Sequence, residues 1–181
     1  MSATTQAELQ ALQAAEQSQY LTFLLDGEMY AIGILAIKEI IEFNKLTTVP
    51  MMPLFVRGVI NLRGAVVPVI DLSARFGRAG TTASRRTCIV IVEIEADEGR
   101  QVVGVLVDSV SEVLDIAPGE IEPAPSFGAR VRSEFIAGMG KVKGNFVIIL
   151  SVGHVLSAEE MGVLAAVDTD MPVAAGAGAR G

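Results

Sequence analysis

Tryptophan is absent from this chain of 181 residues, which has a single cysteine, a single histidine and two tyrosines. One cysteine excludes an internal disulfide, and Cys88, inside the apolar run TCIVIV, is most simply a buried strand residue. One histidine, His154, excludes a multi-histidine metal site and most acid–base relays. No phosphate loop of the Walker type occurs. These absences leave no enzyme signature above background, and we expect neither a metal nor a cofactor.

Long apolar runs are missing as well. The longest, such as residues 102–107 and 146–150, fall far short of the roughly 18 residues that a membrane-spanning helix needs. Residues 1–19 lack the basic and apolar regions of a secretory signal. We therefore expect a cytoplasmic protein that does not insert into a membrane.

Charge is unevenly distributed along the chain, whose formal net charge is −7. Residues 57–86 carry six arginines and one aspartate (6 − 1 = +5), whereas residues 87–122 carry nine acidic side chains and one arginine (1 − 9 = −8). Such asymmetry favours oriented contacts between proteins. Nucleic acid is a less favoured partner, because the chain is acidic and only Phe76 lies near the later arginines as a stacking candidate.

Short apolar runs separated by turn signals predict a mainly β chain. The expected strands lie at residues 20–25, 28–33, 37–43, 66–72, 87–95, 101–108, 111–116 and 146–152. Residues 1–17 and the Ala- and Gly-rich residues 171–181 offer little to pack and are expected to be flexible tails. Ser157 and Glu160 have the spacing of a capping box, so a C-terminal helix is expected over residues 154–170.

Parts of the chain repeat. GVINLRG at residues 58–64 matches GMGKVKG at residues 138–144 with an offset of 80, and the apolar and acidic pattern of residues 34–42 matches residues 107–115 with an offset of 73. Two copies, each of about five short strands, fit two small barrels better than one open sheet, because closure removes exposed edges. We expect barrels over residues 18–85 and 86–153, with the first strand able to pair with the second barrel.

Two local patterns leave alternatives open. Asp71 and Asp108 each end an apolar strand, where turn acceptors explain them more simply than a paired-carboxylate active site. Ile37, Glu39 and Ile41 share a face if this segment is a strand, but the spacing of its isoleucines also fits a helix. Glu39 is then either a solvated edge residue or a charge at the rim of an apolar binding surface.

Several spaced motifs resemble those of one known family. NLRGAVVPVIDL, VVGVLVDSVSEVL, IEPAPSF and FIAGMGKVKGNFVIIL occur in this order, and over residues 18–162 the chain resembles the CheW-type chemotaxis coupling proteins. The resemblance implies a non-enzymatic scaffold, or adaptor, of two SH3-like five-stranded β-barrels. Its implied partners are the regulatory domain of a CheA-type histidine kinase, which has the same double-barrel fold, and the cytoplasmic tip of methyl-accepting chemoreceptors. The implied location is the cytoplasm, at the inner face of the membrane in receptor arrays.

The resemblance also implies which residues meet these partners. The positions that match sensitive positions of the family are Ile37, Glu39, Gly58, Arg63 and Gly64. Arg63 resembles the family's interaction arginine, because its planar fork can bond a carboxylate or carbonyl of a partner while Gly64 lets a backbone approach.

The resemblance implies, further, a groove between the barrels that holds the receptor tip. Its apolar walls are expected from Ile37, Val105, Val107 and Val110. Two other functions stay open from the sequence: a fragment of a kinase regulatory domain, which shares the fold, and an RNA-binding double β-barrel, whose affinity would fall steeply with salt.

Overall fold

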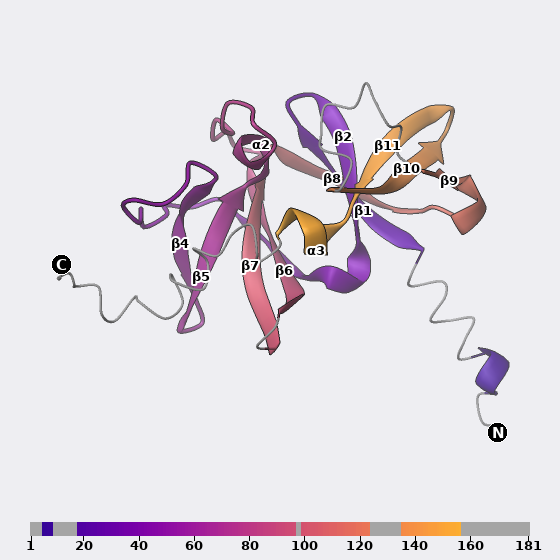
Figure 1. Ribbon diagram of the computed structural model, residues 1–181, viewed down its shortest axis with the longest axis horizontal. Helices are drawn as coiled ribbons and strands as arrows, with labels where there is room; N and C mark the ends of the chain where they lie inside the picture. Colours follow the sequence, from indigo (N-terminus) through magenta and orange to yellow (C-terminus); the bar gives the residue numbers. More distant parts are fainter. Residues whose placement is uncertain (1–4, 9–17, 97–98, 124–134, 157–181) are drawn as a thin grey trace.

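The computed structural model describes residues 5–8, 18–96, 99–123 and 135–156, and it confirms a mainly β chain. Two sheets lie side by side along the long axis of the molecule (Figure 1). The five-stranded sheet has the order β3-β6-β7-β5-β4 and the six-stranded sheet the order β8-β1-β2-β11-β10-β9.

The strands of the five-stranded sheet are β3 (Ile37–Glu42), β4 (Val56–Leu62), β5 (Ala65–Asp71), β6 (Cys88–Ala96) and β7 (Gly99–Val107). Those of the six-stranded sheet are β1 (Gln19–Leu25), β2 (Glu28–Gly33), β8 (Ser109–Asp115), β9 (Ile121–Glu122), β10 (Ile136–Val142) and β11 (Asn145–Leu150). Short helices are η1 (Ile34–Ala36), α2 (Leu72–Arg75), η2 (Pro118–Glu120) and α3 (Val152–Val155). The eight expected strands are present, whereas β4, β9 and β10 were not expected, because glycines and turn residues weaken their alternating pattern.

Sheet membership corrects the expected division of the chain at residues 85 and 86. The hairpin of β6 and β7, expected in the second barrel, inserts between β3 and β5 of the first sheet, and both β1 and β2 join β8 to β11. Two parallel pairings produce this arrangement, β5 with β7 and β11 with β2. The sequence repeat compared residues 34–42 and 58–64 with their counterparts, which leave out β1, β2 and β6, so it could not assign these strands to a sheet.

The repeat itself is present in the backbone. The turns of the β4–β5 and β10–β11 hairpins have positive φ at both central residues, 53° and 89° at Arg63 and Gly64, and 51° and 83° at Lys143 and Gly144. Such turns match the twist of paired strands. The edge strands β3 and β8 also correspond, and the pairing of each with its neighbour is interrupted by a register shift.

Glycine allows each sheet to close. Thr47, which follows β3, pairs with Val59 of β4, and β9, which follows β8, pairs with β10. A Cβ atom at Gly58 would lie 2.5 Å from the carbonyl oxygen of Thr47, and one at Gly138 would lie 2.5 Å from Cγ2 of Ile121. In both sheets, therefore, the segment after one edge strand reaches the opposite edge, which is the closure that a barrel requires.

The core consists of a large cluster between the sheets and a smaller cluster for each sheet. The central cluster takes side chains from both sheets, including Val105 and Val107, which are 4% and 0% exposed. A row of aromatic rings passes through it from Phe23 to Tyr30, Phe76 and Phe135, with successive centroids 6.1, 5.8 and 6.0 Å apart. The two halves thus share one core and are held together by it.

No helix in the described ranges is long and apolar enough to cross a membrane.

Two further expectations concern the ends of the chain. The short helix α3 (Val152–Val155) shares only its last two residues with the helix expected over residues 154–170, and residues 157–181 lie outside the described residues. Of the expected tail over residues 1–17, the structure describes residues 5–8.

Candidate functional site

Two of the residues expected to meet partners form an ion pair with each other. Arg63 donates from Nη1 to Oε2 of Glu39 at 2.5 Å and from Nη2 to Oε1 at 2.9 Å. The hydrogen bonds from Arg63 lower the pKa of the Glu39 carboxyl below its ordinary value, and the same bonds raise the pKa of Arg63. The pair joins the hairpin turn to the edge strand β3, so it spans the seam at which the sheet closes.

Local turn chemistry presents Arg63 to solvent. The backbone N–H of Gly64 donates to Oδ1 of Asn61 at 2.9 Å, which stabilises the positive-φ turn that Arg63 occupies. The Arg63 side chain remains 70% exposed despite its bond to Glu39. A guanidinium has five N–H donors and Glu39 engages two of them, so three remain for a partner.

The two glycines among the expected site residues differ in role. Gly58 is buried and has a φ of 154°, and the closing segment contacts it where a side chain would stand, so its requirement is structural. Gly64 has a φ of 89°, and no other residue lies within 4 Å of the point where a Cβ atom would stand. Gly64 is thus required by conformation alone, and its surface is free for an approaching backbone.

Of the four side chains expected to form the walls of a groove, two lie at the surface and two do not. Ile37 of β3 and Val110 of β8 occupy equivalent positions and are partly buried against the central cluster. Val105 and Val107 lie on the inner strand β7 and are buried, so the expectation that they form exposed walls of a groove is corrected. Val105 lines only a small apolar hollow together with Leu72 and Leu150.

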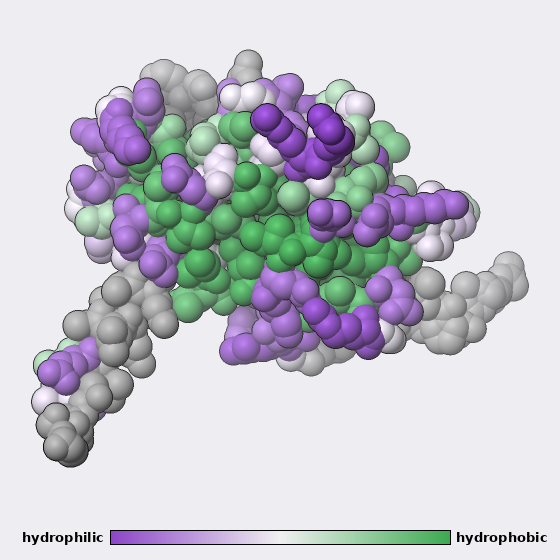
Figure 2. Space-filling model, turned by 180° about the vertical axis from the view of Figure 1, so that it is seen from behind, coloured by the Kyte–Doolittle hydropathy of each residue, from purple (hydrophilic) through white to green (hydrophobic). Residues whose placement is uncertain are grey.

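Apolar side chains beside Ile37 and Val110 remain exposed. Ile40 of β3 is 43% exposed and Val113, its equivalent on β8, is 45% exposed. Figure 2 shows a continuous apolar band across the face turned away in Figure 1, bordered by hydrophilic residues. Ile40 and Val113 thus leave exposed apolar area on an edge strand of each sheet.

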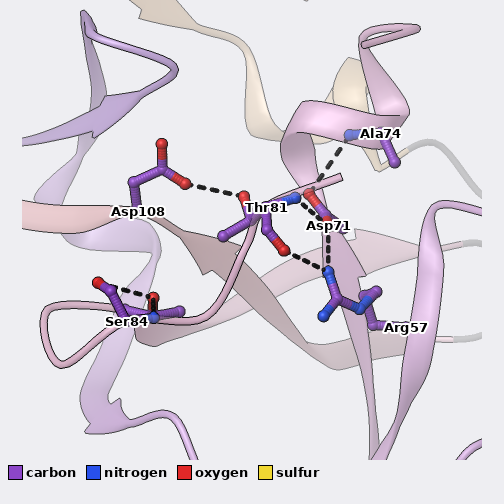
Figure 3. A network of polar contacts seen from close by, with 7 residues as sticks. Arg57, Asp71, Ala74, Thr81, Ser84 and Asp108 are labelled. Carbon is purple, nitrogen blue, oxygen red and sulfur yellow. Dashed lines mark hydrogen bonds and ion pairs between the residues drawn. The ribbon is translucent and has the colours of Figure 1, made fainter. Parts of the chain in front are cut away.

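Asp71 and Asp108 act as hydrogen-bond acceptors that fix a loop (Figure 3). Oδ2 of Asp71, a fully buried residue, accepts from Nη1 of Arg57 at 2.6 Å and from the backbone N–H of Thr81 at 2.8 Å. Thr81 also donates from Oγ1 to Asp108 at 2.9 Å, and Asp108 accepts from the backbone N–H of Asp26 at 2.7 Å. The network ties the loop after α2 to both sheets, as turn acceptors would.

Sequence reasoning missed two exposed apolar side chains in the loop between β3 and β4. Met51 is 100% exposed and Leu54 is 92% exposed. The available signal was the segment PMMPLF at residues 50–55, an apolar run that belongs to no strand pattern.

Metal or thiol chemistry finds no support in the described part of the chain. No group of three or more His, Cys, Asp or Glu side chains there is arranged to hold a metal ion. Burial, with a contribution from Glu42, raises the pKa of the Cys88 thiol, which disfavours the reactive thiolate.

Comparisons with known proteins agree with this geometry. The family model described as the CheW-like domain matches residues 19–160. The chain is 35% identical over 146 residues to the chemotaxis protein CheW of Klebsiella aerogenes, covering 81% of this chain and 86% of that protein. It is 31% identical over 142 residues to the chemotaxis protein CheW of Rhizobium meliloti, covering 78% and 89%.

A solved structure is similar too. The crystal structure of the scaffolding protein TtCheW from Thermoanaerobacter tengcongensis superimposes with a TM-score of 0.68 at 34% identity, covering 75% of this chain and 85% of that one. The family model spans both sheets, and together with these relatives it shows that the chain belongs to the CheW-like family of chemotaxis proteins.

Proposed function

We propose that this protein is a non-enzymatic adaptor that couples methyl-accepting chemoreceptors to a CheA-type histidine kinase and controls the activity of that kinase. Family membership supports this role. The main structural observation in its favour is the exposed guanidinium of Arg63, which the β4–β5 turn holds at the surface. Its place would be the cytoplasm, at the inner face of the membrane in receptor arrays.

The receptor would bind the apolar surface between the two edge strands. Ile37 and Val110 supply partly buried walls, and the apolar band of Figure 2 provides the area that an amphipathic helix face needs. A receptor tip that is a helical hairpin can bury its apolar side chains there while its polar side stays in water.

Arg63 would add specificity at one side of this surface. Its three remaining N–H donors can bind a carboxylate or backbone carbonyl of a partner, and the bond to Glu39 holds the fork in one orientation beforehand. Because the two sheets share a core, a partner that shifts one sheet also displaces surfaces on the other. Such a shared core is a physical route for coupling receptor state to kinase activity.

The test is the phosphorylation rate of a CheA-type kinase with a receptor cytoplasmic fragment, measured with and without this protein. We expect the kinase rate to depend on the receptor only when the protein is present. A kinase that neither binds the protein nor changes its rate would contradict the proposal. A parallel titration with single-stranded RNA at two salt concentrations tests the alternative of an RNA-binding barrel.

A further inference from the structure

A polar cavity of about 430 Å³ lies where the two sheets meet. It is lined by Ser73 and Arg78 of the segment after β5, by the loop at residues 79–84, by Asp26 in the β1–β2 turn and by Asp108 between β7 and β8. Its volume falls in the range of small-molecule sites, roughly 300–1,000 Å³. None of the residues expected to meet protein partners lines it. The cavity is therefore a separate candidate site.

Hydrogen bonds hold the walls of the polar cavity in place. Thr81 lies between Asp71 and Asp108 and donates to both, as Figure 3 shows. Asp108 also accepts from the backbone N–H of Asp26 at 2.7 Å, so groups from both sheets are fixed around the cavity. Walls that are held beforehand lower the free-energy cost of binding a small ligand.

Three polar groups on these walls have no bonding partner among the described residues. Nη1 of Arg78 is fully buried without a hydrogen bond, while Nη2 donates to the hydroxyl of Tyr30 at 2.7 Å and to Oε1 of Glu28 at 3.2 Å. Ser73 is 4% exposed, and its hydroxyl forms no hydrogen bond within the described ranges. The Asp26 carboxylate forms neither a hydrogen bond nor an ion pair there. A buried donor without an acceptor is costly, so a ligand that supplies one is favoured here.

The charges around the polar cavity suit a ligand that carries both signs. The Arg78 guanidinium requires an acceptor, and a carboxylate is the strongest one available. Asp26 and Asp108 require donors, and each oxygen of Asp108 accepts one hydrogen bond where its lone pairs allow two. An ammonium group supplies such donors. A simple anion would be repelled by the two aspartates, and a simple amine would leave Nη1 of Arg78 without an acceptor.

We propose that the polar cavity binds a small α-amino acid with a polar side chain. Arg78 and Ser73 donate to its carboxylate. Its ammonium group donates to Asp26 and Asp108, and its side chain lies against the hydroxyl-rich loop at residues 79–84. Because these groups come from both sheets, the ligand bridges the sheets and stabilises the folded chain. The inference goes beyond the adaptor function, which is proposed for other surfaces.

The test is a titration of the isotope-labelled full chain, followed by NMR of its backbone amides. The probe is L-asparagine. Its matched analogues are β-alaninamide, which lacks the α-carboxylate, and succinamate, which lacks the ammonium group. We expect L-asparagine to cause saturable shifts at the amides of Asp26 and residues 79–84, and both analogues to bind at least tenfold more weakly. No saturable shift with L-asparagine, or equal binding of either analogue, would overturn the proposal.

Two variants test the position of the site. Asp26→Asn removes the charge of a carboxylate that has no bond among the described residues, and the new residue tolerates the φ of 53° at this position. Ser73→Ala removes the free hydroxyl from the buried side of α2. Each variant should weaken L-asparagine binding about tenfold.

Glu120→Gln is the matched control, because it neutralises an exposed acid that does not line the polar cavity. It should leave the affinity for L-asparagine within about twofold of wild type. Melting curves recorded without ligand verify that each variant is folded. Unchanged affinity in both Asp26→Asn and Ser73→Ala would contradict the assignment of the site.

Discussion

The β4–β5 and β10–β11 hairpins have the same two-residue turn, yet their cations are held differently. Arg63 is fixed to Glu39 by two hydrogen bonds. Lys143 occupies the equivalent turn position, and no ion pair joins it to Glu112, the counterpart of Glu39 in the repeat. The turn geometry is thus a requirement of the fold, whereas the bidentate pair belongs to one copy only.

The segments that follow the two hairpins extend the contrast. Asp71 precedes α2, accepts from the backbone N–H of Ala74 and binds Arg57. Ser151, eighty residues later, precedes α3 without a side-chain capping bond, and Ala137 stands where the first copy has Arg57. Polar bonds therefore join the hairpin and helix of the five-stranded sheet, whereas in the equivalent part of the six-stranded sheet the Ser151 hydroxyl bonds Nδ1 of His154 at 2.7 Å and caps no backbone N–H.

The largest difference in free energy of unfolding between the two copies should appear at the residues that precede α2 and α3. Asp71→Ala leaves Arg57 without its buried partner and should lower the free energy of unfolding by about 3–5 kcal/mol. Ser151→Ala removes no capping bond and should cost less than about 1 kcal/mol. Urea unfolding of both variants measures the two losses in free energy of unfolding. Losses of similar size would mean that the two copies do not differ in stability at these positions.

The closing glycines give the next largest effect. Gly58→Ala meets the carbonyl oxygen of Thr47 at a φ of 154°, and we expect a loss of about 3 kcal/mol. Gly138→Ala meets the Cγ2 methyl of Ile121 at 2.5 Å and the carbonyl oxygen of Glu122 at 3.2 Å, but its φ lies outside the left-handed region, so a smaller loss of about 1–2 kcal/mol is expected. Chemical denaturation of the two variants would contradict this account if Gly138→Ala were the more damaging substitution.

The smallest effect concerns the titration of Glu39. Its pKa lies below the ordinary value of 4.5, chiefly because Arg63 donates hydrogen bonds to the ionised form. Stability from this pair is therefore present above the unfolded pKa and is lost as the pH falls through the lower, folded pKa. Arg63→Gln should move the midpoint of Glu39 upward, as measured by carbon NMR of its carboxyl group, whereas Lys143→Gln should leave it unchanged.

Sequence reasoning predicted those elements that have a clear local pattern in the sequence. Eight of the strands followed from apolar runs, and the matched cation–glycine turns followed from comparing residues 58–64 with residues 138–144. The sequence could not place β6 and β7 in the first sheet, because parallel pairing of β5 with β7 depends on contacts distant in the chain. For the same reason Val105 and Val107 were expected at a groove and lie in the core.

Sequence reasoning predicted part of the candidate site. Glu39 and Arg63 were both named from the resemblance, but their bond was not foreseen, because it exists only once the sheet closes and brings residues of separate strands together. Met51 and Leu54 were missed since apolar residues in a proline-flanked loop have no period to signal their exposure.

The central claim is that the first hairpin, and not its structural twin, contacts a partner through its arginine. The most direct measurement is receptor-dependent phosphorylation by the kinase with Arg63→Glu and, as the matched control, Lys143→Glu. Both substitutions reverse an exposed turn cation, so melting temperatures should stay within about 3 °C of wild type. We expect Arg63→Glu to reduce receptor control of the kinase at least tenfold and Lys143→Glu to leave it within about twofold. Equal effects of the two variants, or a larger effect of Lys143→Glu, would contradict the claim.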